Sequence, residues 1–278
     1  MKKIILLFCT INLFVSPAFA LNLFDNKDET AIKNLLKSQV KYANKTNFNK
    51  FIKTYDETYI NSDGFNLDTY SNIVKDIWST YDNIKYDIQI KKINVKDNTA
   101  SVELIETSDA KIKLSDIYSG ELKSVADSIY YIKKNNNGKW KVISDKVVDE
   151  TTSMLYGTAK NLDVKLSVPN KIDANMDYTA TLEFIPPYGT IAMASIASDL
   201  VEYPQKPTKE VFRAMPEDNI LERIFTSNNQ NLNEYVVASV GLTKSMISDM
   251  EIKIHLTGFG YVIKRVNVVP KKEKDNNE

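Results

Sequence analysis

The chain has 278 residues, its 36 basic and 36 acidic side chains balance, and 43% of its residues are hydrophobic. This balance lacks the dense positive field that nucleic acid or an anionic membrane would attract, and it argues against both as partners. The apolar content and length are those of a globular protein with one large core or two ordinary ones.

The first twenty residues have the three parts of a secretory signal peptide: a basic start, an apolar run over residues 4–15 and an Ala-Phe-Ala exit at residues 18–20. The apolar run is too short to cross about 30 Å of hydrocarbon as a stable helix, so an uncleaved anchor is only the alternative. Cleavage near Leu21 predicts an exported protein, periplasmic or secreted, that does not insert into a membrane. The exported chain would carry 34 basic and 36 acidic residues, a charge of −2.

Cysteine and histidine are almost absent. Cys9 lies inside the signal segment, so the exported chain has no thiol for disulfides, nucleophilic catalysis or thiolate metal sites. His255 stands alone in an alternating segment and is interpreted as a strand residue at the surface. The sequence therefore predicts no metal site and no cofactor, and it contains no catalytic signature.

After the leader the chain shows the 3.6-residue period of three amphipathic helices. The first begins behind Asn26, with Glu29 three residues on, and the third begins at Asn66 or Asp68. The three apolar stripes are Ile32, Leu35, Leu36, Val40 and Ala43; Phe48, Phe51, Ile52 and Tyr55; and Tyr70, Ile73, Val74, Ile77, Trp78 and Tyr81.

Beyond Asp82 the period changes to two, which is typical of strands. The predicted strands cover residues 86–95, 99–107, 124–133 and 139–148, with hairpin turns at residues 96–98 and 135–138. Helices followed by an antiparallel meander bury their apolar faces when a strongly curved sheet wraps around the helices. The sequence therefore predicts an α+β cone, three helices packed on a curved antiparallel sheet, over residues 21–150.

This order of elements resembles the nuclear transport factor 2-like, or SnoaL-like, superfamily over about residues 26–150. The resemblance rests on the stretch 55–70 with its Asp63-Gly64 turn, on the strand at residues 99–104 and on the closing strand at residues 138–143. Members of the superfamily include isomerases, dehydratases, hydrolases and non-enzymatic binding or accessory domains, so the fold alone assigns no activity. The resemblance implies a pocket inside the cone, lined by apolar and aromatic residues with one or two polar groups.

Asp127 is the candidate functional polar group. Strand alternation places it on the face of Val125, Ile129 and Tyr131, which is unusual company for a carboxylate. A desolvated carboxylate beside a tyrosine can shuttle a proton, as in ketosteroid isomerase. Ligand binding is thus predicted for Asp127 and Tyr131, and also for two aromatic residues of the helical part, Tyr55 and Trp78.

Each candidate also has a simpler interpretation. Asp127 would be hydrated if it lies at a sheet edge or over a groove, and aromatic residues at helical spacing, such as Tyr55 and Trp78, usually fill a core. The family's enzymes that pair a histidine with an aspartate inside the cone need both residues. This domain has no histidine, so that mechanism is excluded, and no catalytic residue is carried over.

Residues 151–160 are predicted to be a linker, beyond which helical periodicity nearly vanishes. Short alternating segments then recur at residues 162–168, 178–184, 190–197, 220–225, 234–242, 251–257 and 261–268. They predict an immunoglobulin-like β-sandwich over residues 161–270, followed by a charged, disordered tail over residues 271–278.

The sequence leaves three functional hypotheses open. The leading one is an exported non-catalytic binding or accessory protein of the bacterial cell envelope, with a small-ligand pocket in the cone. The first alternative is a SnoaL-like enzyme of isomerase, dehydratase or hydrolase type, in which Asp127 and a tyrosine transfer a proton. The second is a structural or assembly subunit, with a homodimer through the cone-domain sheet. The expected partner is an unidentified protein or a small apolar ligand.

Overall fold

The computed structural model describes residues 27–206, 209–248 and 251–271. The predicted signal peptide, the Asn26 cap and residues 272–278 of the predicted tail lie outside these residues. The described helices are α1 (Lys27–Ala43), α2 (Phe48–Ile52), α3 (Leu67–Thr80) and the 3₁₀ helix η1 (Thr158–Asn161). The described strands are β1 (Lys85–Lys96), β2 (Thr99–Lys113), β3 (Ser119–Lys134), β4 (Trp140–Gly157), β5 (Lys165–Ser167), β6 (Lys171–Asp173), β7 (Asp177–Glu183), β8 (Ile191–Leu200), β9 (Arg213–Ala214), β10 (Ile220–Thr226), β11 (Glu234–Ser248) and β12 (Glu251–Val269).

The helices begin at polar caps. Asn66 Oδ1 accepts a hydrogen bond from the Thr69 N–H at 3.0 Å, which satisfies a donor in the first turn of α3 and confirms the predicted start. Asn47 caps α2 in the same way. Because α2 ends at Ile52, Tyr55 of the predicted second stripe lies beyond it and forms a β-bridge with Val142 of β4.

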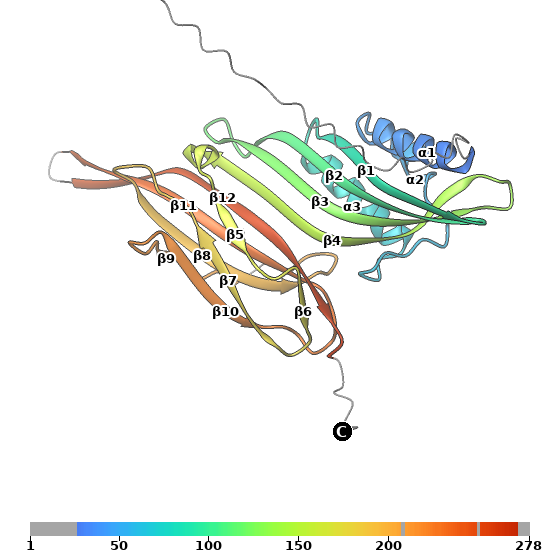
Figure 1. Ribbon diagram of the computed structural model, residues 1–278. Coiled ribbons are helices and arrows are strands. Elements are labelled where there is room, and N and C mark those ends of the chain that lie inside the picture. The colour runs from blue at the N-terminus through green and yellow to red at the C-terminus, as the bar shows by residue number, and fades with distance from the viewer. Residues whose placement is uncertain (1–26, 207–208, 249–250, 272–278) are drawn as a thin grey trace, which may run out of the picture.

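One antiparallel sheet runs through both halves of the described chain. Its strand order is β1-β2-β3-β4-β12-β11-β8-β9, and β6 pairs in parallel with β12. The helices pack against one face of the curved strands β1–β4, as predicted for the α+β part, while the far end of the β11–β12 hairpin lies at the opposite end of the molecule (Figure 1).

Residues 151–160 do not form the predicted linker. β4 continues to Gly157, and its residues 151–157 pair with β3 on one side and β12 on the other. Thr151, Thr152 and Tyr156 favour extended backbone, and no breaker precedes Gly157, so the strand continues past its predicted end. The sheet of the cone therefore extends directly into the C-terminal half.

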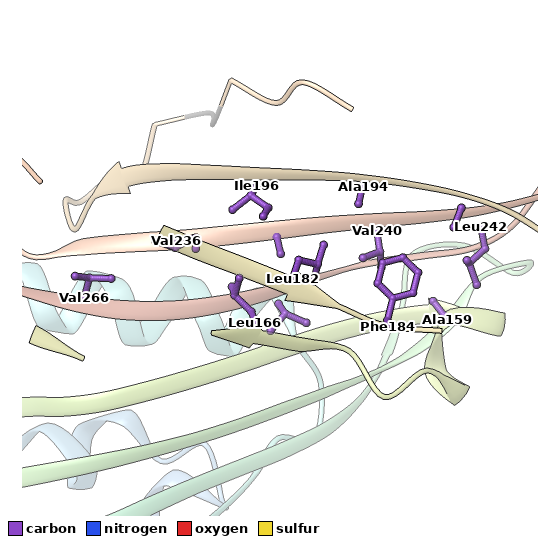
Figure 2. Packing of buried hydrophobic residues seen from close by; sticks show 14 of the residues in the cluster. Ala159, Leu166, Leu182, Phe184, Ala194, Ile196, Val236, Val240, Leu242 and Val266 are labelled. Carbon is purple, nitrogen blue, oxygen red and sulfur yellow. The ribbon is translucent and has the colours of Figure 1, made fainter. Parts of the chain in front are cut away.

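The C-terminal half has a second, smaller sheet of β10, β7 and β5. Apolar side chains of both layers meet between this sheet and β8, β11 and β12. Figure 2 shows them, among others Leu166, Leu182, Phe184, Ile196, Val240 and Val266. The half is all-β with two layers, but one layer continues the sheet of the cone. An immunoglobulin-like topology and the bounds of the two domains stay predictions.

Candidate functional site

A cavity of about 170 Å³ lies between the helices and the sheet of the cone. Most of its lining is apolar or aromatic: Leu36, Val40, Ala43, Phe51, Tyr55, Tyr70, Ile73, Val74, Ile77, Trp78, Tyr86, Ile88, Leu104 and Tyr130. Asp87 and Thr107 of the lining are exposed, as is Ile77 of α3. This side therefore forms the mouth of the cavity.

Phenol groups provide much of the polar surface of the cavity. Tyr55 OH and Tyr70 OH share a hydrogen bond of 2.9 Å, and Trp78 Nε1 donates to Tyr86 OH at 3.0 Å. Burial raises the pKa of Tyr55, Tyr70 and Tyr86 above the ordinary tyrosine value. These hydroxyl groups consequently keep their hydrogens at neutral pH.

Glu106 is the carboxyl group on the inner wall of the cavity. β2 places it on the face of buried Val102 and Leu104, and Tyr130 OH of β3 donates to its Oε2 at 2.9 Å. Burial raises the pKa of Glu106, while the hydrogen bond from Tyr130 acts in the opposite direction. Glu106 therefore takes up a proton at higher pH than a free glutamate does, whereas burial also raises the pKa of Tyr130 and keeps its phenol protonated.

Gln39 of α1 supplies a buried amide group to the same cavity. It lies within one turn of Leu36 and Ala43, on the face of α1 that packs against the sheet. The residue is only 6% exposed, and its Nε2 has no hydrogen-bond partner among the described residues. The inner part of the cavity thus combines an apolar wall with the carboxyl group of Glu106, several hydroxyl groups and the unpaired Nε2 of Gln39.

The structure corrects the predicted position of Asp127 and Tyr131, which do not line the cavity. They lie on the opposite face of β3, where Val125 is 50% exposed and Tyr131 is 41% exposed. Asp127 Oδ1 forms an ion pair with Lys91 Nζ at 2.7 Å. Alternation along a strand shows which residues share a face, but not which face meets the helices.

Tyr55 and Trp78, in contrast, do line the cavity. Both also belong to the packed core of the cone, so their position fits core packing as well as contact with a ligand. Their role in ligand binding stays a prediction. Sequence reasoning missed Glu106, although it alternates with Val102 and Leu104 in the strand that begins at Thr99.

A second group of buried polar residues lies close to the cavity. The ring of Tyr59 lies 5.0 Å from that of Tyr55, and Tyr59 OH donates to Asp145 Oδ2 at 2.5 Å. Burial raises the pKa of Asp145 to about 6; the hydrogen bond from Tyr59 opposes this shift, and the charge of Glu106 adds to it. Proton uptake by Asp145 is therefore coupled to the charge of Glu106 in the cavity.

A buried ion pair connects the cone with the C-terminal half. Arg265 of β12 pairs with Asp63 in the turn before α3, and the two side chains are 1% and 7% exposed. Asn233 Nδ2 donates to the same carboxylate oxygen of Asp63 at 2.7 Å, and Arg265 Nε donates to Asn267 Oδ1 at 3.0 Å. The Asp63-Gly64 turn, which was predicted only as part of the family resemblance, is therefore a contact between the two halves.

A larger cavity of about 460 Å³ lies where α3 faces the C-terminal half. Glu150 of β4 lines it and accepts a hydrogen bond from Tyr235 OH of β11 at 3.2 Å. Tyr203 OH, in the segment after β8, donates to Asp76 Oδ2 of α3 at 2.5 Å. Both halves thus build this second cavity, whose lining contains none of the predicted site residues.

Within residues 27–206, 209–248 and 251–271, no group of three or more His, Cys, Asp or Glu side chains could hold a metal ion. Over the same residues, no helix has the length and apolar character that crossing a bilayer requires.

No protein-family model matches the sequence, and no curated protein matches it. Solved structures match 44% of the chain. Bd1075 from Bdellovibrio bacteriovorus has 17% identity and a TM-score of 0.37, and the chain spans 40% of its length. A protein with a cystatin-like fold from Nostoc punctiforme has 16% identity over 90% of its length, with a TM-score of 0.34. A protein of the NTF2-like family from Streptomyces avermitilis has 12% identity over 95% of its length, with a TM-score of 0.36.

Proposed function

We propose that this chain is an exported, non-catalytic binding protein of the bacterial cell envelope, and that the cone holds a small apolar ligand. The observation that carries the proposal is the cavity of about 170 Å³ between α1, α3 and β1–β3. Its volume is similar to that of engineered apolar cavities of about 150 Å³ that bind benzene. A concave apolar lining with a few convergent polar groups is typical of small-molecule sites. Export rests on the signal-peptide pattern of residues 1–20.

Filling the cavity tests the proposal. Val40 of α1 lines it, so Val40→Phe should displace an apolar ligand such as ethylbenzene and weaken its binding at least about tenfold. Val125→Phe is the matched control, because Val125 is 50% exposed on the other face of the sheet. Isothermal titration calorimetry measures both affinities, and thermal unfolding confirms that both variants fold. Equal binding by the wild type and Val40→Phe would contradict the proposal, as would no binding by the wild type.

An enzymatic function is favoured by a different observation, the hydrogen-bonded pair of Glu106 and Tyr130 inside the cavity. A carboxyl group with a raised pKa is suited to proton transfer, which is the chemistry of the SnoaL-like alternative. In this alternative Glu106 takes the role that the sequence suggested for Asp127. It requires turnover of the bound ligand, whereas the binding proposal requires none.

A role in assembly is favoured by exposed apolar side chains on two surfaces. Val125 and Tyr131 lie on the outer face of the cone sheet, which the proposed homodimer would cover. Ile252 and Ile254, near the far end of the β11–β12 hairpin, are 70% and 66% exposed. Exposed apolar patches commonly mark contacts between proteins. Binding in the cavity and assembly through these surfaces are compatible with each other.

A further inference from the structure

Gln39 Nε2 is buried and has no hydrogen-bond partner in the described part of the chain. Gln39 lines the cavity and is only 6% exposed. A buried N–H group without a partner lowers stability, and an apolar residue would fit the packed face between Leu36 and Ala43 without that cost. The unpaired amide therefore indicates a hydrogen-bond acceptor supplied from outside the chain.

The hydroxyl groups of the cavity point to the same ligand chemistry. Tyr86 OH accepts from Trp78 Nε1 at 3.0 Å, so its own hydrogen is still available for a ligand. Tyr55 and Tyr70 share one hydrogen bond of 2.9 Å, which leaves one of their two hydrogens free. The cavity thus offers N–H and O–H donors to its occupant.

The charged groups of the lining argue against an ionised ligand. Glu106 and Asp87 are acidic, and no Lys, Arg or His belongs to the lining among the described residues. An anion would lose its water shell without gaining a cationic partner. A cation would pair with Glu106 but leave the N–H groups of Gln39 unpaired.

We infer that the cavity binds a neutral apolar ligand that carries a carbonyl or ether oxygen, and that Gln39 Nε2 donates a hydrogen bond to that oxygen. The inference rests on the proposed binding function because it concerns the same cavity. A volume of about 170 Å³ restricts the ligand to about one ring with a short substituent.

Four probes of similar size separate the alternatives: ethylbenzene has no polar group, acetophenone has a carbonyl oxygen, benzoate is an anion and benzylamine is a cation. Binding to the exported chain is measured by calorimetry at pH 7. We expect acetophenone to bind tightest, with benzoate and benzylamine weaker. Gln39→Met keeps the side-chain length and removes the amide, so it should weaken acetophenone binding by about fivefold and leave ethylbenzene binding unchanged.

Gln89→Met is the matched control, because Gln89 of β1 is exposed and does not line the cavity; both affinities should stay at the wild-type values. Gln39→Leu replaces Gln39→Met if the latter does not fold. An unchanged ratio of acetophenone to ethylbenzene affinity in the Gln39 variants overturns the inference but leaves the proposed function intact. Tighter binding of benzoate or benzylamine than of acetophenone also overturns it. If none of the four probes binds the wild type, both proposals fail.

Discussion

The carboxyl group of Asp145 links the stability of the protein to pH. Burial raises its pKa from the ordinary value of 3.8 to about 6, although the hydrogen bond from Tyr59 acts against this shift. The folded state consequently binds this proton more tightly than the unfolded state. The resulting stabilisation is complete below about pH 4 and is lost as the pH rises through about 6.

Asp145→Asn should remove this pH dependence, because the amide keeps the shape of the side chain without the titration. A shift of about two pKa units corresponds to about 3 kcal/mol. We expect the free energy of unfolding of the wild type, minus that of Asp145→Asn, to fall by about that amount between pH 4 and pH 7. Urea unfolding at each pH measures the difference. Tyr131→Phe, an exposed control, should show no such trend, and a flat difference for Asp145→Asn would contradict the assignment.

The residue that sequence reasoning chose for the site shows what one strand can and cannot predict. Asp127 shares its face with Val125 and Tyr131, but that face is the outer one, and Asp127 is paired with Lys91. Both faces of this strand carry apolar residues, so alternation alone did not identify the inner one. Pairing with β2, which sets Val102 opposite Tyr130, identifies the inner face and places Glu106 on it. The residue pattern of β3 alone does not contain this pairing, because it depends on how the two strands are arranged in space.

Glycines allow the close approach of β4 and β12, the two strands that join the halves. A Cβ atom on Gly260 would lie 2.4 Å from Met154 O, and one on Gly258 would lie 2.4 Å from Ala159 N. Both neighbours are backbone atoms, which cannot rotate away as a side chain would. The pairing of β12 with β4 therefore depends on the absence of a side chain at Gly260, and the contact of β12 with η1 depends on its absence at Gly258.

Gly260→Ala should destabilise the protein by about 2 kcal/mol, because the strands must separate to admit the methyl group. Gly241→Ala in the adjoining strand β11 is the control. Its Cβ would meet nothing nearer than Met193 O at 4.0 Å, and we expect a change within about 1 kcal/mol. Chemical unfolding gives both values. Equal stability of the two variants would show that the β4–β12 contact adapts to a side chain.

The same glycines explain an error in the predicted strands. Residues 251–257 and 261–268 were predicted as two strands, yet both belong to the single strand β12, which runs through Gly258 and Gly260. Elements with local signals were predicted well: the Asn66 cap fixed the start of α3, and the turns at residues 96–98 and 135–138 lie between the expected strands. The partner of β4 is set by contacts over a hundred residues apart, which local patterns do not contain.

Over the whole molecule, the ion pair of Asp63 and Arg265 connects segments 202 positions apart. The turn before α3 places Asp63 beside β12, and Asn233 completes the contact from the segment before β11. Burial makes this pair sensitive to the loss of one partner, because the remaining charge would be held out of water.

Asp63→Asn should lower the free energy of unfolding by about 3 kcal/mol, since it leaves the buried Arg265 guanidinium without its carboxylate. Asp116→Asn is the control for a surface ion pair, because Asp116 and its partner Lys113 are 97% and 63% exposed. We expect less than about 1 kcal/mol for this control. Denaturant unfolding at neutral pH compares the two. A small effect of Asp63→Asn would mean that other carboxylates near Arg265, such as Glu150, compensate for the loss.

The position of β12 in the sheet has a consequence for the chain while it is being synthesised on the ribosome. β12 is the last described strand to be synthesised, yet it lies in the middle of the sheet, between β4 and β11. Until it emerges, residues 151–157 of β4 display unpaired backbone groups that a neighbouring nascent chain can capture. The growing polypeptide stays open to such capture until β12 itself has been synthesised.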